Sequence, residues 1–140
     1  MTGQDESTEV VEMKRIVVVG GVAGGMSAAA RLRRLDESAS IVVLEKGGDV
    51  SFANCGLPYH VADEIVQRSK LLLHTPETLK AGFDLDVRTH HEVLGIDREA
   101  RTVQVRDHSR GTTYDEPYDA LVLATGAEPI VPPFPGVDRP

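Results

Sequence analysis

The chain has 140 residues, 41% of them hydrophobic and 26% charged, and a formal net charge of −7. This length allows one domain with a substantial core, whereas the acidic charge excludes the basic surface that nucleic-acid phosphates require. No apolar run approaches the roughly 20 residues that cross a bilayer, and the single cysteine, Cys55, excludes an internal disulfide and a CxxC motif. We therefore expect a cytoplasmic protein whose partners are neither nucleic acids nor membranes.

Residues 1–13 are mostly polar and acidic, which predicts a disordered leader and makes Met13 an alternative start. The β-branched residues Ile16 to Val19 then predict a strand, from about Arg15 to Val19, that is buried on both faces. The next stretch, from about Gly24 to Leu35, has the spacing of an amphipathic helix. The helix positions expected to be buried are Ala28, Leu32 and Leu35.

A glycine-rich turn joins this strand to this helix and contains Gly20, Gly21, Gly24 and Gly25. Its backbone N–H groups can approach a phosphate closely, and the N-terminus of the helix adds a partial positive charge. The dinucleotide pattern G-x-G-x-x-G falls on Gly20, Val22 and Gly25, so its middle glycine is missing. Taken alone, the turn fits either a diphosphate site or an ordinary connection between a strand and a helix.

A second apolar run, Ile41 to Leu44, predicts another strand, and it ends in Glu45, 20 residues after Gly25. An acidic residue at this position of a βαβ unit can bind the two ribose hydroxyls of a dinucleotide. The carboxylate would also repel a 2′-phosphate. The order of strand, glycine turn, helix, strand and acid therefore favours a dinucleotide site.

Three arginines, Arg31, Arg33 and Arg34, lie near the end of the first predicted helix. Cations there complement the helix dipole. One of them could instead bind a phosphate group of a substrate, and the sequence leaves both readings open.

The segment VSFANCGLPYH, from Val50 to His60, contains the only thiol. Because Pro58 is tolerated only in the first turn of a helix, we expect a helix to start near Asn54 or Cys55. A cysteine at a helix N-terminus favours the reactive thiolate. The alternative is that Cys55 is a small buried hydrophobic residue.

The second half of the chain predicts a short helix and then mainly strands. Thr75 is expected to cap the helix, Pro76 to occupy its first position, and Gly82 to end it. The expected strands are 84–90, 92–97, 102–107, 112–114 and 118–123, of which the middle three form an antiparallel meander and the last is buried. The five histidines lack metal-ligand spacing, so no metal site is predicted.

Three features together resemble the N-terminal part of flavoprotein pyridine nucleotide-disulfide oxidoreductases. They are the glycine turn with Glu45, the segment SFANCGLPY, and the segment ATGAEP after the last strand. The resemblance spans Lys14 to Pro140. It implies an α/β fold, namely a Rossmann-like FAD-binding domain with a central parallel sheet, helices and a three-stranded antiparallel β-meander, incomplete relative to the family.

The resemblance also implies a domain organisation and a set of site residues. Residues 14–128 would form the N-terminal portion of the FAD-binding domain, and residues 129–140 a proline-rich linker toward a missing NAD(P)H domain. The implied FAD-binding residues are Gly20, Gly21, Val22, Ala23, Gly24, Gly25, Glu45, Lys46, Val93, Ala124, Thr125 and Gly126. The implied substrate-binding residues are Ser51, Asn54, Arg34 and Arg31, and the implied catalytic residue is Cys55.

Within the family, SFANC with one redox cysteine resembles the coenzyme A-disulfide reductases and their persulfide-reducing relatives. NADH peroxidases and oxidases of the family carry a histidine inside the glycine loop, where this chain has Ala23. The implied reaction passes electrons from NAD(P)H through FAD to Cys55 and then to a small-molecule disulfide or persulfide, in a homodimeric full-length enzyme. The chain alone is expected to be inactive, and the alternatives are an NADH oxidase or peroxidase and a non-catalytic nucleotide-binding fragment.

Overall fold

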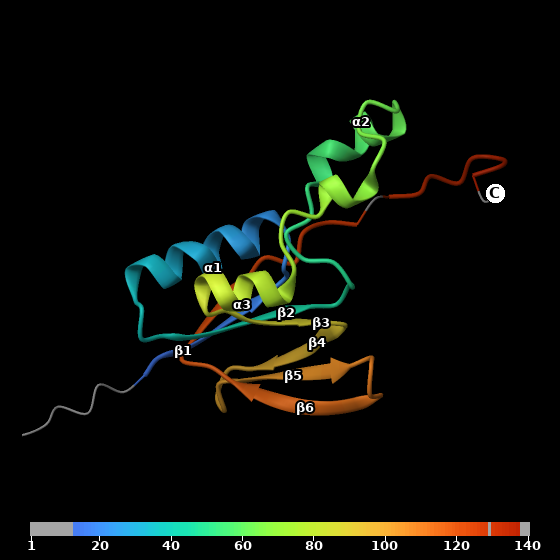
Figure 1. Ribbon diagram of the computed structural model, residues 1–140. Helices are drawn as coiled ribbons and strands as arrows, with labels where there is room; N and C mark the ends of the chain where they lie inside the picture. Colours follow the sequence, from blue (N-terminus) through green and yellow to red (C-terminus); the bar gives the residue numbers. More distant parts are fainter. Residues whose placement is uncertain (1–12, 129, 138–140) are drawn as a thin grey trace, which may run out of the picture.

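The computed structural model describes residues 13–128 and 130–137. Its centre is a four-stranded parallel sheet with the strand order β3-β2-β1-β7. Helices cover one face of this sheet, and a three-stranded antiparallel meander, β4-β5-β6, covers the other (Figure 1). The predicted α/β fold with a parallel sheet and a meander is confirmed.

The elements follow the chain in an order close to the predicted one. The parallel strands are β1 (Arg15–Val19), β2 (Ser40–Glu45), β3 (Asp86–Thr89) and β7 (Ala120–Leu123). The meander strands are β4 (His91–Asp97), β5 (Thr102–Asp107) and β6 (Thr112–Pro117). The helices are α1 (Ala23–Leu35), α2 (Leu57–Val61) and α3 (Pro76–Phe83), and two short 3₁₀ turns are η1 (Asn54–Gly56) and η2 (Arg68–Leu71).

The parallel sheet separates two hydrophobic clusters, because successive side chains of a strand point to opposite faces. In β1, Ile16 and Val18 pack beneath the helices, whereas Val17 and Val19 pack against the meander. Strand β2 alternates in the same way. The prediction that the first strand is buried on both faces is confirmed.

The buried face of α1 differs from the predicted one. Gly25, Met26 and Ala29 are buried, whereas Leu35 is 65% exposed. Gly25 faces the carbonyl of Gly20, and this contact fixes the rotation of the helix. Leu35 then lies about 80° around the helix from Gly25 and turns toward solvent. Of the three positions predicted as buried, Leu32 packs partly against the core.

The last strand also differs from its prediction. It begins at Ala120 rather than at Tyr118, and Leu123 is 60% exposed. Among the described residues, β7 pairs only with β1 and therefore forms an edge of the sheet. A strand at an edge keeps one side in contact with solvent, which is why the predicted burial is wrong.

Helix α3 begins as predicted and ends one residue later than predicted. The Thr75 hydroxyl accepts the backbone N–H of Thr78, and Pro76 occupies the first turn. The helix continues through Gly82 to Phe83, and Asp84 ends it with a left-handed backbone, φ 48°. Asp84 takes the terminating role expected of the glycine, since a short polar side chain tolerates this conformation.

A buried carboxylate attaches the meander to the parallel sheet. Glu116 of β6 is 4% exposed and accepts hydrogen bonds from Arg15 Nε of β1, at 2.8 Å, and from Arg88 of β3, at 2.6 Å. Two cations therefore compensate the desolvation of one buried anion. This pairing fixes how the meander lies on the sheet.

The contact between Gly25 and Gly20 yields a stability prediction. A Cβ atom on Gly25 would lie 1.8 Å from the Gly20 carbonyl oxygen, so Gly25→Ala should lower the free energy of unfolding by about 1–3 kcal/mol or more. Gly24→Ala is the matched control, because its Cβ would meet nothing closer than 3.7 Å and alanine favours a helix by about 0.5–1 kcal/mol. Equal denaturant midpoints for the two variants would contradict the proposed role of Gly25.

Candidate functional site

The glycine turn is closely packed and admits no side chain at two of its positions. Gly20 has φ 102°, and a Cβ there would lie 2.1 Å from the carbonyl oxygen of Ala124. A Cβ on Gly21 would lie 2.8 Å from a methyl group of Val50. The turn is thus held between the end of β7 and the segment after β2.

The missing middle glycine of the dinucleotide pattern has a structural explanation. Val22 precedes α1 with φ −100°, so its backbone does not adopt the positive φ that favours glycine. Within the described residues, no side chain caps this helix and its first turn holds no acidic residue. The N–H groups of Ala23, Gly24 and Gly25 therefore remain available to an anion.

Glu45 lies at the centre of the predicted ribose site. Its two carboxylate oxygens accept the backbone N–H of Gly21, at 2.8 Å, and of Gly47, at 2.7 Å. Each oxygen keeps a second acceptor position, which two ribose hydroxyls could use. The carboxylate therefore fits the predicted ribose contact while it also braces the glycine turn.

A cavity of about 200 Å³ opens beside Glu45, at the carboxyl ends of β1 and β2. Five residues predicted to bind FAD line it: Gly20, Glu45, Lys46, Val93 and Thr125. Lys46 forms an ion pair with Glu128 at 3.0 Å, and this hydrogen bond and charge raise the pKa of Lys46. His91 and Glu92 also line the cavity, and the sequence offered no signal for them because they reach it through the fold of the meander.

Ala124, another residue predicted to bind FAD, packs against the glycine turn. Ala124 donates its N–H to the carbonyl of Val19, at 2.8 Å, and lies against Gly20. Its methyl group would lie 3.7 Å from a Cβ atom added to Gly24. The fold thus brings together the glycine turn, Glu45 and the segment after β7, and these residues fit the adenosine diphosphate half of FAD.

Cys55 is exposed, so the alternative that it is a small buried hydrophobic residue is wrong. It lies in the 3₁₀ turn η1, and α2 begins only at Leu57. A helical stretch therefore does begin at Asn54, as expected, but its first turn is 3₁₀ and the α-helix with Pro58 in its first turn starts at Leu57.

Backbone hydrogen bonds attach the Cys55 segment to the glycine turn. The Ser51 N–H donates to the Gly21 carbonyl at 2.8 Å, and the Ser51 carbonyl accepts the Leu73 N–H at 3.2 Å. The Ala53 N–H donates to the carbonyl of Leu71 at 2.8 Å. The segment that carries the thiol therefore adjoins the predicted dinucleotide site.

Two neighbouring cavities lie between α1 and α3 and share Phe83, and we call them together the furrow. Its first part is a cavity of about 210 Å³ lined by Met26, Ser27, Ala30, Ser51, His74, Leu79 and Phe83. Its second part, of about 450 Å³, shares Phe83 and reaches Arg34. Of the predicted substrate residues, Ser51 thus lines one of these cavities and Arg34 the other. Ser27, His74 and Phe83 were not predicted, since the packing of α3 on α1 creates their common surface.

The three arginines of α1 have different surroundings. Arg33 donates to the carbonyls of Phe83, at 2.9 Å, and of Glu37, at 2.7 Å, and so fastens the end of α1 to α3. Arg31 and Arg34 are exposed, and with the exposed Ser27 they follow one stripe of the helix. Arg33 therefore has a structural role at the end of the helix, whereas Arg31 and Arg34 remain candidates for substrate binding.

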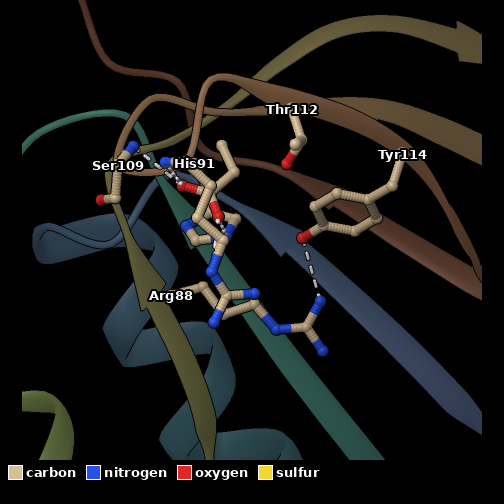
Figure 2. A pocket seen from close by; sticks show the side chains of 7 residues that line it. Arg88, His91, Ser109, Thr112 and Tyr114 are labelled. Atoms are coloured by element: carbon tan, nitrogen blue, oxygen red, sulfur yellow. Dashed lines mark hydrogen bonds and ion pairs between the residues drawn. The ribbon is translucent and has the colours of Figure 1, made fainter.

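A separate polar cavity of about 490 Å³ lies at the hairpin end of the meander and contains none of the predicted site residues (Figure 2). The Arg88 guanidinium donates to the Tyr114 hydroxyl at 3.0 Å, and hydrogen bonds to Asp86, Tyr114 and Glu116 raise the pKa of Arg88 although burial opposes this. Burial would raise the pKa of Asp107, but the N–H groups of Arg110 and Ser109 hold it below its usual range. Arg88, Tyr114 and Asp107 therefore all have hydrogen-bond partners within the protein.

The described residues contain no group of three or more His, Cys, Asp or Glu side chains placed to hold a metal ion. No helix in the described part of the chain is long and apolar enough to cross a membrane.

Comparison with known proteins identifies the family. The profile of the pyridine nucleotide-disulphide oxidoreductases matches residues 14–140. The chain belongs to this family. A coenzyme A disulfide reductase of Staphylococcus epidermidis is 44% identical over 115 residues, which are 82% of this chain and 26% of the relative.

Solved structures of this oxidoreductase family have the same fold. The reduced Bacillus anthracis protein CoADR-RHD is 49% identical, with a TM-score of 0.85 over 90% of this chain and 23% of that protein. An NAD-dependent persulfide reductase from A. fulgidus is 39% identical, with a TM-score of 0.83 over 89% of this chain and 23% of that protein. The chain thus spans about a quarter of the length of these relatives.

Proposed function

We propose that this chain is the N-terminal FAD-binding portion of a flavoprotein disulfide reductase. One observation carries the proposal. The turn that fits a dinucleotide and the segment that holds an exposed cysteine share a hydrogen bond, from Ser51 N–H to the Gly21 carbonyl, at 2.8 Å. A reductase of this kind needs a redox cofactor and a reactive thiol side by side, and membership of the oxidoreductase family supports this reading.

The FAD-binding residues are proposed as follows. The first turn of α1 binds the diphosphate through the N–H groups of Ala23, Gly24 and Gly25, which no side chain caps. The N–H groups of Gly20 and Gly21 donate to the Leu44 carbonyl and to Glu45, so these two glycines shape the turn. Glu45 binds the ribose hydroxyls, and the cavity beside Val93 and Thr125 receives the adenine. Lys46 and the segment Ala124–Gly126 form the rim. When bound, the flavin would accept a hydride from NAD(P)H and supply the electron pair that disulfide reduction consumes.

Cys55 is the proposed nucleophile. Its thiolate attacks one sulfur of the substrate disulfide, so that a mixed disulfide forms and the first thiol leaves. Two electrons and a proton then release the second thiol and restore the Cys55 thiolate. A single protein cysteine suffices because the substrate contributes the second sulfur. Ser51 and Asn54 precede Cys55 in the sequence and are proposed to orient the disulfide.

The proposed substrate is coenzyme A disulfide or a related disulfide or persulfide. The furrow between α1 and α3 supports this choice, because Ser51 lines one of its two cavities and the exposed Arg34 lines the other. A long ligand with a sulfur at one end and phosphates at the other fits that order of groups. Arg34 and Arg31 are the proposed phosphate contacts.

The parts that lie outside this chain are also proposals. The relatives are about four times as long, so we propose that residues 129–140 lead toward an NAD(P)H-binding domain and that the complete enzyme is a homodimer. A cytoplasmic location fits a reducing compartment in which Cys55 stays a thiol.

The purified chain is expected to bind added FAD and to show the visible absorbance of a bound flavin. Glu45→Gln should weaken FAD binding about tenfold or more, since charge-assisted hydrogen bonds to the ribose contribute about 1.5–3 kcal/mol. Glu99→Gln, on the exposed turn between β4 and β5, is the control and should bind FAD normally. A chain that ignores FAD, or a Glu45→Gln variant with unchanged affinity, contradicts the proposed site.

Cys55→Ser in the complete enzyme is expected to reduce NAD(P)H-dependent turnover of coenzyme A disulfide by about 10³-fold or more, because it removes the nucleophile. The flavin spectrum should stay unchanged, which separates lost chemistry from lost folding. Substantial turnover without Cys55 would reject the proposed mechanism.

Arg34→Gln in the complete enzyme is expected to raise KM for coenzyme A disulfide about tenfold, through the loss of a phosphate contact. The KM for cystine, which has no phosphate, should not change. Arg106→Gln, on an exposed position of the meander, is the matched control. An equal effect of Arg34→Gln on both substrates would place the phosphates elsewhere.

A further inference from the structure

Ser51 has a backbone conformation that is unusual for its residue type. Its φ is 53°, in the left-handed region that disfavours residues with a side chain. Such a conformation persists only where the surroundings impose it, and it often occurs at functional sites. Ser51 also lines the furrow between α1 and α3.

This conformation lets the two backbone groups of Ser51 reach two different segments. Its N–H donates to the Gly21 carbonyl at 2.8 Å, and its carbonyl accepts the Leu73 N–H at 3.2 Å. Leu73 precedes His74, which lines the same furrow. Ser51 is therefore the point at which the glycine turn, the Cys55 segment and one wall of the furrow meet.

Gly21 carries this connection on to Glu45. Its N–H donates to one Glu45 carboxylate oxygen at 2.8 Å, and its carbonyl accepts the N–H of Ser51. A Cβ on Gly21 would lie 2.8 Å from a Val50 methyl carbon and 3.1 Å from the Glu45 Cβ, so these neighbours enclose the residue tightly. A movement of the Glu45 carboxylate would therefore displace Gly21, and through Gly21 it would displace Ser51.

We propose that Ser51 is a positioning residue whose left-handed backbone transmits nucleotide binding at Glu45 to the Cys55 segment and to the furrow. The inference rests on the proposed nucleotide site but assigns Ser51 a role beyond contact of its hydroxyl with substrate. Ribose hydroxyls that donate to Glu45 hold the carboxylate in the orientation that also binds Gly21. Local opening of the Ser51–Gly21 hydrogen bond then becomes rarer, because it must disturb the bound nucleotide.

Amide hydrogen exchange in the full chain measures this coupling directly. ADP is the probe, since it carries the ribose and the diphosphate without a flavin, and calorimetry reports its binding independently. At saturating ADP the exchange of the Ser51 and Leu73 amides is expected to slow by at least about fivefold, because a ligand suppresses the openings that expel it. The Gly111 amide, which donates to Asp107 in the β5–β6 turn, is the internal control and should not change.

Substitutions at Ser51 separate its backbone from its hydroxyl. ADP should also slow the alkylation of Cys55 by iodoacetamide, which is a second readout of the coupling. Ser51→Gly adopts φ 53° without cost, and Ser51→Ala removes only the hydroxyl. Both variants should therefore keep the slower exchange at Leu73 and the slower alkylation of Cys55. Ser51→Val should lose both responses, since a β-branched residue is excluded from this conformation. If Ser51→Val does not fold, the glycine and alanine variants still show whether the response to ADP depends on the Ser51 hydroxyl.

The outcomes are distinct. Calorimetric binding of ADP without a change at Ser51, Leu73 or Cys55 overturns the coupling and leaves the nucleotide site intact. If both Ser51→Ala and Ser51→Gly lose the response to ADP, the effect depends on the Ser51 hydroxyl, and the proposed role of the Ser51 backbone is overturned. Absence of ADP binding overturns both the inference and the proposed function.

Discussion

The close approach of α1 to the glycine turn is the constraint on which the rest of the structure depends. Gly25 lies so near the Gly20 carbonyl that no side chain fits between them. This contact sets the rotation of α1, places Met26 and Ala29 against the sheet and leaves Ser27 toward the furrow. The same contact directs the N-terminus of the helix at the opening where a diphosphate is proposed to bind.

The two faces of the parallel sheet are covered by different elements. One face carries α1 and α3, whose contact forms the furrow, and the other carries the meander (Figure 1). The meander is attached through the buried Glu116, paired with Arg15 and Arg88, and this attachment brings Val93 to the cavity beside Glu45. The polar network of Glu116 and the apolar packing of the meander on the sheet together support this wall of the proposed adenine site.

The glycine turn and the Cys55 segment illustrate how a site of this family can be assembled from short stretches that are distant in sequence. The Cys55 segment has no long element of its own, since η1 and α2 together span only Asn54 to Val61. Backbone hydrogen bonds from Ser51 and Ala53 supply the missing support. The placement of the thiol therefore depends on main-chain geometry more than on side-chain packing.

The sequence alone determined the parallel strands, the meander, the glycine turn and the position of Glu45, because hydrophobic periodicity and the special backbone needs of glycine are local properties. Tertiary structure decided the rest. The exposure of Leu35 follows from the contact at Gly25, and the exposure of Leu123 follows from the sheet order. The left-handed Ser51 and the furrow ending at Arg34 arise only where separate segments meet, and no local pattern encodes such a meeting.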